Sequence, residues 1–218
     1  MRELVYLSER KLRQFQVPKK RRFSVREIGI PGIGQVGIDQ QADSHLDAVI
    51  AHLEGIARWY EEDVQVGQWV HFEARLGYHV LGGEDRPTVL LLAEPADRTG
   101  PRRLVLHGAP EHLLGGQAPP PGTDWDDGVL RGSFASFLRP LIRHLMITED
   151  KNPVEDEGKS RALLRQGLSM LNRFLDRALD PDTAAWTAGY ARVTMNTTGL
   201  PMVIASPLYV EYVPPPDQ

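Results

Sequence analysis

Ser8 and Lys11 have the spacing Ser-x-x-Lys, in which a lysine amine can activate a serine hydroxyl for nucleophilic attack. Penicillin-recognising enzymes with this spacing also need Ser-Asp-Asn and Lys-Thr-Gly motifs, and neither tripeptide occurs in the chain. Ser8 also stands between a predicted strand and a predicted helical turn, where a serine hydroxyl commonly caps the turn. The sequence therefore favours a capping role for Ser8 over catalysis.

The glycines at 32, 34 and 37 spell Gly-x-Gly-x-x-Gly, the fingerprint of dinucleotide-binding folds. That fingerprint functions where the glycines join a buried strand to a helix whose N-terminus faces the pyrophosphate. Here the preceding segment is highly charged, Pro31 directly precedes the first glycine, and the next predicted helix begins at Ser44. A glycine-rich hairpin is the better interpretation, and we expect no nucleotide to bind there.

His71, Glu73 and His107 are the side chains best suited to bind a metal. Apolar and polar residues alternate around the first two, so His71, Glu73, Arg75 and His79 share one face of a predicted strand. With His107 or His112 from a neighbouring segment, three ligands could meet there. Alternation alone produces such a row on a solvated face, however, and the cation of Arg75 would repel a metal. We therefore expect neither a metal nor any other cofactor.

The segment that begins at His107 is the most promising place for a ligand. A predicted strand ends just before Pro110, which fixes a turn, and loops at strand ends commonly carry binding sites. The candidate ligand-binding residues are Ser8, Lys11, His107 and Pro110, with Arg75 adding a second cationic contact.

Seven of the 25 basic residues lie in residues 10–22, a segment without acidic residues in a chain of net charge −4. Such a segment can bind the phosphates of nucleic acid or of lipid headgroups. It can equally dock on the acidic stretch at 148–157 of the same chain. Because an acidic protein is a poor general nucleic-acid binder, solvation or internal docking is the favoured interpretation.

The composition of the 218-residue chain is ordinary for a globular protein, except that it contains no cysteine. This absence excludes disulfides, thiolate nucleophiles and cysteine-bound zinc, and it suits a reducing compartment. The N-terminal residues lack the apolar run of a signal peptide, and no segment approaches the roughly 18 apolar residues of a transmembrane helix. We expect a cytoplasmic protein without a transmembrane segment.

Hydrophobic periodicity predicts the elements that must position these side chains. Strands are predicted at 3–7, 69–80, 88–95, 102–108, 186–195 and 202–213, a hairpin around Pro31, and helices at 44–60, 134–147 and 160–179. Ser44 is expected to cap the first helix, and Val70, Phe72, Ala74, Leu76 and Tyr78 to share one strand face. Short connections between the strands at 69–108 favour an antiparallel meander.

We therefore expect an α+β fold, in which about three helices pack on a single mixed, mainly antiparallel sheet. One domain should span residues 1–213, followed by a proline-rich tail at 214–218.

Three segments resemble an uncharacterised family of actinobacterial proteins, mainly from streptomycetes. Residues 5–15, VYLSERKLRQF, are similar to a strand followed by Ser-Asp/Glu-x-Lys. Residues 108–115, GAPEHLLG, match a segment that usually reads Gly-Ser-Pro, from which the alanine departs. Residues 205–210, ASPLYV, are close to Ala-Thr-Pro-Leu-Tyr-Val. The resemblance implies no reaction, but it implies that Ser8, Lys11, Pro110 and Pro207 occupy defining positions.

The leading interpretation is a non-catalytic module that binds a small anionic ligand or a protein partner. One alternative is a hydrolase that uses His71, Glu73 and His107 as acid–base or metal groups. The other is an anchor that binds nucleic acid or lipid through residues 10–22. The sequence leaves the oligomeric state open.

Overall fold

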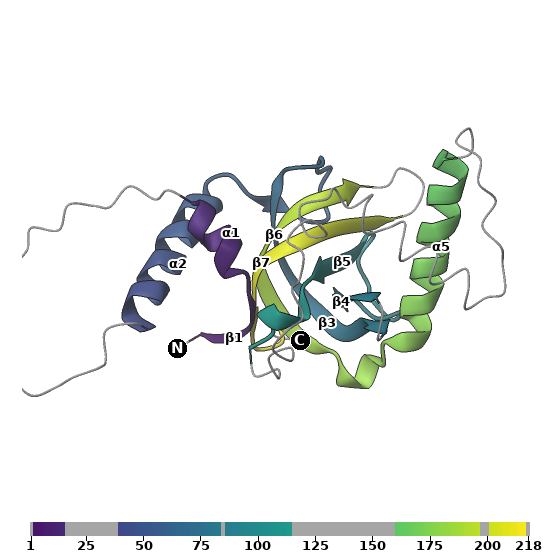
Figure 1. Cartoon of the computed structure of the whole chain (residues 1–218). Coiled ribbons are helices and arrows are strands. Elements are labelled where there is room, and N and C mark those ends of the chain that lie inside the picture. Colours follow the sequence, from purple (N-terminus) through teal and green to yellow (C-terminus); the bar gives the residue numbers. More distant parts are fainter. Residues whose placement is uncertain (1, 16–38, 84–85, 115–159, 197–200, 217–218) are drawn as a thin grey trace, which may run out of the picture.

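Strands make up most of the structure, a computed structural model that describes residues 2–15, 39–83, 86–114, 160–196 and 201–216 (Figure 1). The strands are β1 (Glu3–Leu7), β2 (Arg58–Trp59), β3 (Trp69–Gly83), β4 (Arg86–Ala93), β5 (Arg103–Gly108), β6 (Ala185–Asn196) and β7 (Met202–Tyr212). The helices are α1 (Glu9–Gln14), α2 (Asp39–Glu54) and α5 (Ser160–Ala178), and 3-10 turns lie at Pro110–His112 and Pro181–Thr183.

Five strands form a closed barrel in the order β3-β4-β5-β7-β6, because β6 pairs with both β7 and β3. The pairs are antiparallel except for β5 and β7, which run parallel. Two further strands lie outside the ring: β1 pairs with β7, and β2 pairs with β3. The predicted antiparallel meander is confirmed as β3, β4 and β5, but the expected open sheet was wrong.

The closure depends on the length of β3. Its residues 69–76 pair with β6, whereas its residues 77–83 pair with β4. A strand that serves two neighbours in this way joins the two ends of the sheet. The fold is therefore a mainly β structure built on a closed barrel, and not the expected α+β fold with helices on an open sheet.

The barrel is a Greek key, since three consecutive antiparallel strands are followed by a fourth, β6, that returns beside the first. The OB fold is a five-stranded Greek-key barrel of this type, and it binds oligonucleotides on the outer face of its second and third strands. In this chain those strands are β4 and β5. Their outer residues Leu91, Ala93 and Val105 pack in one cluster with Leu171 and Leu175 of α5. The face that OB folds use for oligonucleotides is therefore covered.

Alternation along the strands fills the barrel with apolar side chains. Val70, Phe72, Ala74 and Leu76 of β3 are all buried, as predicted. The other strands add Leu90, Leu92, Leu104, Leu106, Ala191, Val193, Val203 and Ala205 to this interior cluster. Tyr78, predicted on the same face, is instead 68% exposed. The pairing of β3 with β6 ends at Leu76, before Tyr78. Tyr78 therefore lies on the part of β3 that pairs with β4 but not with β6.

Helices cover two sides of the barrel, with α1 and α2 on one side and α5 on the other (Figure 1). Leucine spacing predicts one buried face for α5, and Leu168, Leu171, Leu175 and the following Leu179 are buried there. Leu164, predicted on the same face, lies outside the residues whose side chains are described. On the opposite side, Leu12, Leu46, Val49 and Leu53 of α1 and α2 form a cluster with Leu208 and Tyr209 of β7.

The helix predicted at 44–60 has different limits, because α2 begins at Asp39 and ends at Glu54. Ser44 thus lies inside the helix and cannot be its cap. Hydrophobic spacing also placed Ile56, Ala57 and Tyr60 on the apolar face of this helix, but all three lie beyond its end, and Ile56 is exposed. The glycine motif at 32–37, the helix predicted at 134–147 and the acidic stretch at 148–157 lie outside the described residues.

Candidate functional site

Three segments that are distant in the sequence meet beside β7. The backbone N–H of Ser8, just before α1, donates to the carbonyl of Leu208 at 2.8 Å. The N–H of Leu114, after the 3-10 turn, donates to the carbonyl of Val5 in β1, also at 2.8 Å. Since β5 pairs with β7 as well, the start of α1, the end of β5 and the middle of β7 form one junction.

A β-bulge in β7 shapes this junction. In the pairing with β6, Tyr190 lies opposite Tyr209 and Ala191 lies opposite Pro207, so Leu208 is an extra residue. Bulges redirect the side chains next to them and are frequent beside active sites. Here the carbonyl of the extra residue accepts the Ser8 N–H, which fixes the start of α1 and brings the following turn over β7.

Lys11 makes the central contact of the site. Its Nζ donates to the hydroxyl Oγ of Ser206 at 2.5 Å and to the carbonyl of Pro207 at 2.6 Å. Among the described residues no carboxylate lies within ion-pair distance of this amine. Burial, which penalises the charged form, lowers the pKa of Lys11 to about 7. Near neutral pH the amine is therefore present in both its charged and its neutral form.

His107 lies on β5, close enough to Lys11 for the charge of the amine to act on its ring. Its Nε2 lies 3.0 Å from Oγ1 of Thr194, whose own hydroxyl donates to the carbonyl of Ile204 at 3.1 Å. Because that hydroxyl hydrogen is already used, Nε2 must carry the hydrogen and donate to Thr194. Burial and then the charge of Lys11 lower the pKa of His107 to about 3, so the imidazole is neutral at pH 7.

This neutral histidine predicts a specific acid sensitivity. In the unfolded chain a histidine binds a proton below pH about 6.5, whereas folded His107 binds one only near pH 3. The unfolded state binds more protons in this window, so stability is lost as the pH falls from about 6.5 towards 3. From pH 7 to pH 4, the wild type should lose on the order of 2 kcal/mol more than His107→Gln, as measured by urea unfolding. Equal losses in both proteins would contradict the assignment.

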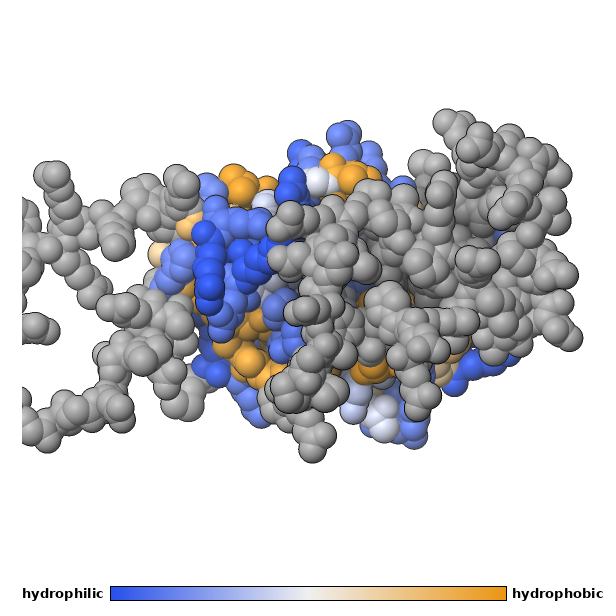
Figure 2. All heavy atoms as spheres, viewed as in Figure 1, coloured by the Kyte–Doolittle hydropathy of each residue, from blue (hydrophilic) through white to orange (hydrophobic). Residues whose placement is uncertain are grey.

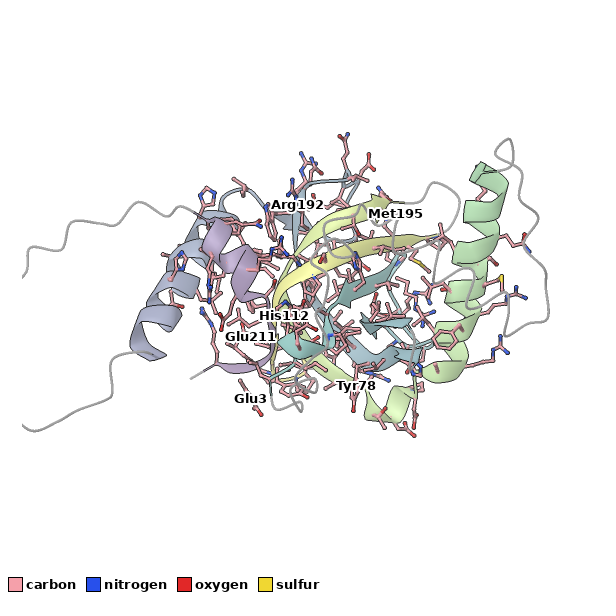
Figure 3. The ribbon with its side chains drawn as sticks, in the orientation of Figure 1. Glu3, Tyr78, His112, Arg192, Met195 and Glu211 are labelled. Carbon is pink, nitrogen blue, oxygen red and sulfur yellow. The ribbon has the colours of Figure 1, made fainter. Side chains whose placement is uncertain are left out.

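His112 lies on the 3-10 turn below α1 (Figure 3). Its ring meets the ring of Tyr6 edge-on, with the centroids 5.6 Å apart and the planes at 84°. Burial lowers the pKa of His112; the Glu111 charge opposes that shift and the Lys11 charge adds to it. The side chain of Tyr6 fits there because Gly108 has no Cβ, which would lie 2.5 Å from the Tyr6 hydroxyl oxygen. The Lys11 amine thus lies close enough to His107 and His112 for its charge to lower the pKa of both imidazoles.

The surface around the junction is mostly hydrophilic where α1 and α2 lie, and apolar residues appear beside it (Figure 2). Ser206, Thr194 and His107 are all partly buried there, so the polar atoms are neither fully solvated nor fully enclosed. Such a mixture of a few convergent polar groups and apolar surroundings is typical of small-ligand sites.

Four of the five predicted ligand-binding residues lie at the junction, and Arg75 lies elsewhere. The four residues at the junction are Ser8, Lys11, His107 and Pro110. Arg75 has other partners: it donates to Oδ2 of Asp97 at 3.0 Å and to the carbonyl of Pro181 at 2.8 Å. No described contact joins Arg75 to the junction.

Ser8 is buried at the N-terminal boundary of α1, but its hydroxyl makes no capping hydrogen bond. The predicted capping role of its side chain was therefore wrong. The spacing Ser-x-x-Lys does contain a lysine that contacts a serine hydroxyl, but the described partner of Lys11 is Ser206.

The candidate metal ligands do not converge in the described part of the chain. His71 on β3 packs between the rings of Trp59 and Tyr190, while Glu73 is exposed. His107 is on β5, and β4 separates the two strands. No group of three His, Asp or Glu side chains that could hold a metal occurs among the described residues. No helix in the described ranges is long and apolar enough to cross a membrane.

Comparison with known proteins identifies a family for this chain. The profile of a family of unknown function, DUF7019, matches residues 4–214, which is nearly the whole chain. The chain belongs to this family. No curated protein and no solved structure is significantly similar to it. The matched range contains all three segments that meet beside β7, but membership assigns no reaction to them.

The sequence analysis did not select Ser206 or Thr194, and it named His112 only as a possible metal ligand. Thr194 and His112 carry no distinctive local pattern. Ser206 does lie in the segment ASPLYV, one of the three segments that resemble the uncharacterised family. Its contact with Lys11 spans 195 residues, so spacing along the chain could not reveal it.

Proposed function

We propose that this protein is a binding module for a small anionic ligand, held at the junction of α1, β5 and β7. The observation that carries the proposal is the Lys11 amine, a partly buried cation that contacts a hydroxyl and a carbonyl. A protonated lysine has three N–H donors. Within the described part of the chain, Ser206 and Pro207 use two of these donors, which leaves one for an anion.

The energetic cost of this lysine supports a functional role. Burial of an amine without an ion-pair partner destabilises the folded state, which is why its pKa is lowered. Such costs concentrate at functional sites, where a bound ligand offsets them. An anion at Nζ would supply the counter-charge that the described residues do not provide, and Ser206 could donate a second hydrogen bond to it.

The alternative sites receive less support. In the segment 10–22, the described part includes Arg13, which pairs with Glu9 on the helix surface, and Lys11, which faces β7 instead of solvent. Residues 16–22 of this segment lie outside the described part, so anchoring to nucleic acid or lipid stays a prediction. The covered outer face of β4 and β5 also favours a small ligand over an oligonucleotide.

We also propose that residues 1–213 act as a single unit, since β1 pairs with β7 at the other end of the sequence. The cysteine-free composition supports action in the cytoplasm. An actinobacterial origin remains part of the proposal, and its support is the resemblance of the three segments.

Binding of anions can be tested by thermal unfolding with inorganic phosphate, acetate, AMP and glucose 6-phosphate, each at matched ionic strength. An anion at about 100 times its dissociation constant should stabilise the protein by about 2.7 kcal/mol. Lys11→Met should abolish this stabilisation. Arg13→Met is the matched control, because Arg13 is an exposed cation on the same short helix and should leave the effect intact.

The stabilisation should also weaken as the pH rises above 7, because the amine then loses its charge. A shift that survives in Lys11→Met, or a wild type that responds to none of these anions, would argue against the proposal.

A further inference from the structure

Ser206 and Lys11 form a hydroxyl–amine pair that the anion-binding proposal does not fully explain. Nζ and Oγ lie 2.5 Å apart, so the amine and the hydroxyl are in direct contact. We propose that Ser206 is a nucleophile and Lys11 its general base, so that the site cleaves a small carboxylic ester or amide. The inference rests on the proposed function, because the carboxylate product would be the anion that protonated Lys11 retains.

The geometry matches what an activated serine requires. A nucleophile needs a base within hydrogen-bond reach, and the base needs a third group that orients it. The carbonyl of Pro207, 2.6 Å from Nζ, is that third group. When the amine is neutral, one N–H donates to Pro207 and the lone pair can accept the Ser206 proton. Serine–lysine pairs of this kind replace histidine in some hydrolases.

The pairing of β7 with β6 places Ser206 beside the amine. Ser206 lies opposite Arg192 of β6, one residue before Pro207 and two before the bulge at Leu208. The same bulge anchors Ser8, one helical turn before Lys11. A single irregularity in β7 therefore sets the positions of both reacting groups, and sites built on strands are more precise than sites on loops.

The surroundings keep the base usable at neutral pH. Burial lowers the pKa of Lys11 to about 7, so a large fraction of the amine is neutral and able to accept a proton. The neighbouring His107 is neutral and does not compete for that proton, since its pKa is about 3. Ser206 itself is partly buried and not sealed in the core, unlike Pro207 and Leu208 on the same strand.

The reaction balances with water as the co-reactant. Oγ of Ser206 bonds to the carbonyl carbon while its proton passes to Nζ of Lys11. The bond to the leaving alcohol or amine then breaks, and the leaving group takes that proton. Water next gives a proton to Nζ and attacks the acyl-serine, Oγ leaves with the proton, and the acid product ionises to a carboxylate.

A fluorophosphonate probe, read by intact-protein and peptide mass spectrometry, tests the nucleophile directly. The wild type should gain one phosphonyl group on Ser206, at a rate that rises with pH as Lys11 becomes neutral. Ser206→Ala should lose the label. Lys11→Arg should react at least about 100-fold more slowly, because a guanidinium cannot act as a base at this pH. Ser169→Ala, which removes a partly buried serine on α5, is the matched control and should label like the wild type.

The two proposals fail in different ways. Lys11→Arg keeps a cation, so it should still be stabilised by acetate while it loses the labelling, and Ser206→Ala should behave similarly. If the wild type binds acetate but Ser206 is not labelled, the proposal that Ser206 is a nucleophile is overturned, and the proposal of a binding module stands. Labelling of Ser206 that is equally fast in Lys11→Arg would overturn the role of Lys11 as base. Thermal unfolding of each variant confirms that it is folded before labelling.

Discussion

Replacing Gly189 with alanine should lower the free energy of unfolding by at least about 3 kcal/mol, as measured by urea denaturation. Gly189 lies on β6 opposite Val210 of β7. A Cβ at this position would lie 2.2 Å from the carbonyl oxygen of Tyr209 and 2.9 Å from Cζ of Phe72. The first of these is a backbone atom, so relief requires β6 and β7 to separate, and side-chain rotation cannot provide it.

The change would also reach the candidate site. Tyr209 directly follows the bulge residue Leu208, whose carbonyl anchors Ser8. Movement of β7 at this point should therefore weaken fluorophosphonate labelling as well as stability.

Gly55→Ala provides the control for the Gly189 experiment, because a Cβ at Gly55 would meet its nearest atom, the carbonyl of His52, at an ordinary 3.6 Å. Its effect should stay within about 0.5 kcal/mol. If Gly189→Ala were as mild as Gly55→Ala, the close packing of β6 on β7 would be incorrect.

Asp176→Ala should cost on the order of 3 kcal/mol, because it leaves a buried guanidinium without its counter-charge. Arg103 on β5 is fully buried, and its Nη1 lies 2.6 Å from Oδ1 of Asp176 on α5. The same guanidinium donates to Oδ1 of Asn172 at 2.9 Å and to the carbonyl of Glu94 at 2.7 Å. This cluster joins α5 to the barrel, and loss of the carboxylate penalises the cation that remains.

Two variants separate this effect from the simple loss of a salt bridge. Asp47→Ala removes the carboxylate that Arg2 binds at 2.5 Å on the surface, and it should cost at most about 1 kcal/mol. The double variant Arg103→Leu with Asp176→Leu should be more stable than Asp176→Ala, since no buried charge is then left unpaired. Equal losses from Asp47→Ala and Asp176→Ala, measured by urea unfolding, would show that burial of Arg103 does not matter.

The candidate site combines residues from distant segments of the chain, so short sequence motifs did not predict its chemistry. The spacing of Ser8 and Lys11 indicated a serine–lysine pair, and the absence of companion motifs favoured a non-catalytic interpretation. In the described structure Lys11 contacts a different serine, Ser206. The β-bulge near Ser206 is not indicated by any local sequence pattern. Ser8 and Pro110 were predicted near Lys11 and do lie at the same junction, whereas Arg75 has its partners elsewhere.

Hydrophobic patterning predicted most of the strands and the buried faces of individual elements, although it misplaced the limits of α2. Alternation from Val70 to Leu76 identified the inner face of β3, and leucine spacing identified the buried face of α5, because each pattern records which side of an element avoids water. It could not determine the partners of those faces. Closure of the barrel requires hydrogen bonds between residues 69–76 and 185–192, and the Lys11–Ser206 contact joins groups 195 residues apart. Both depend on non-local pairing, which only the tertiary structure decides, since periodicity encodes exposure and not the identity of the neighbouring strand.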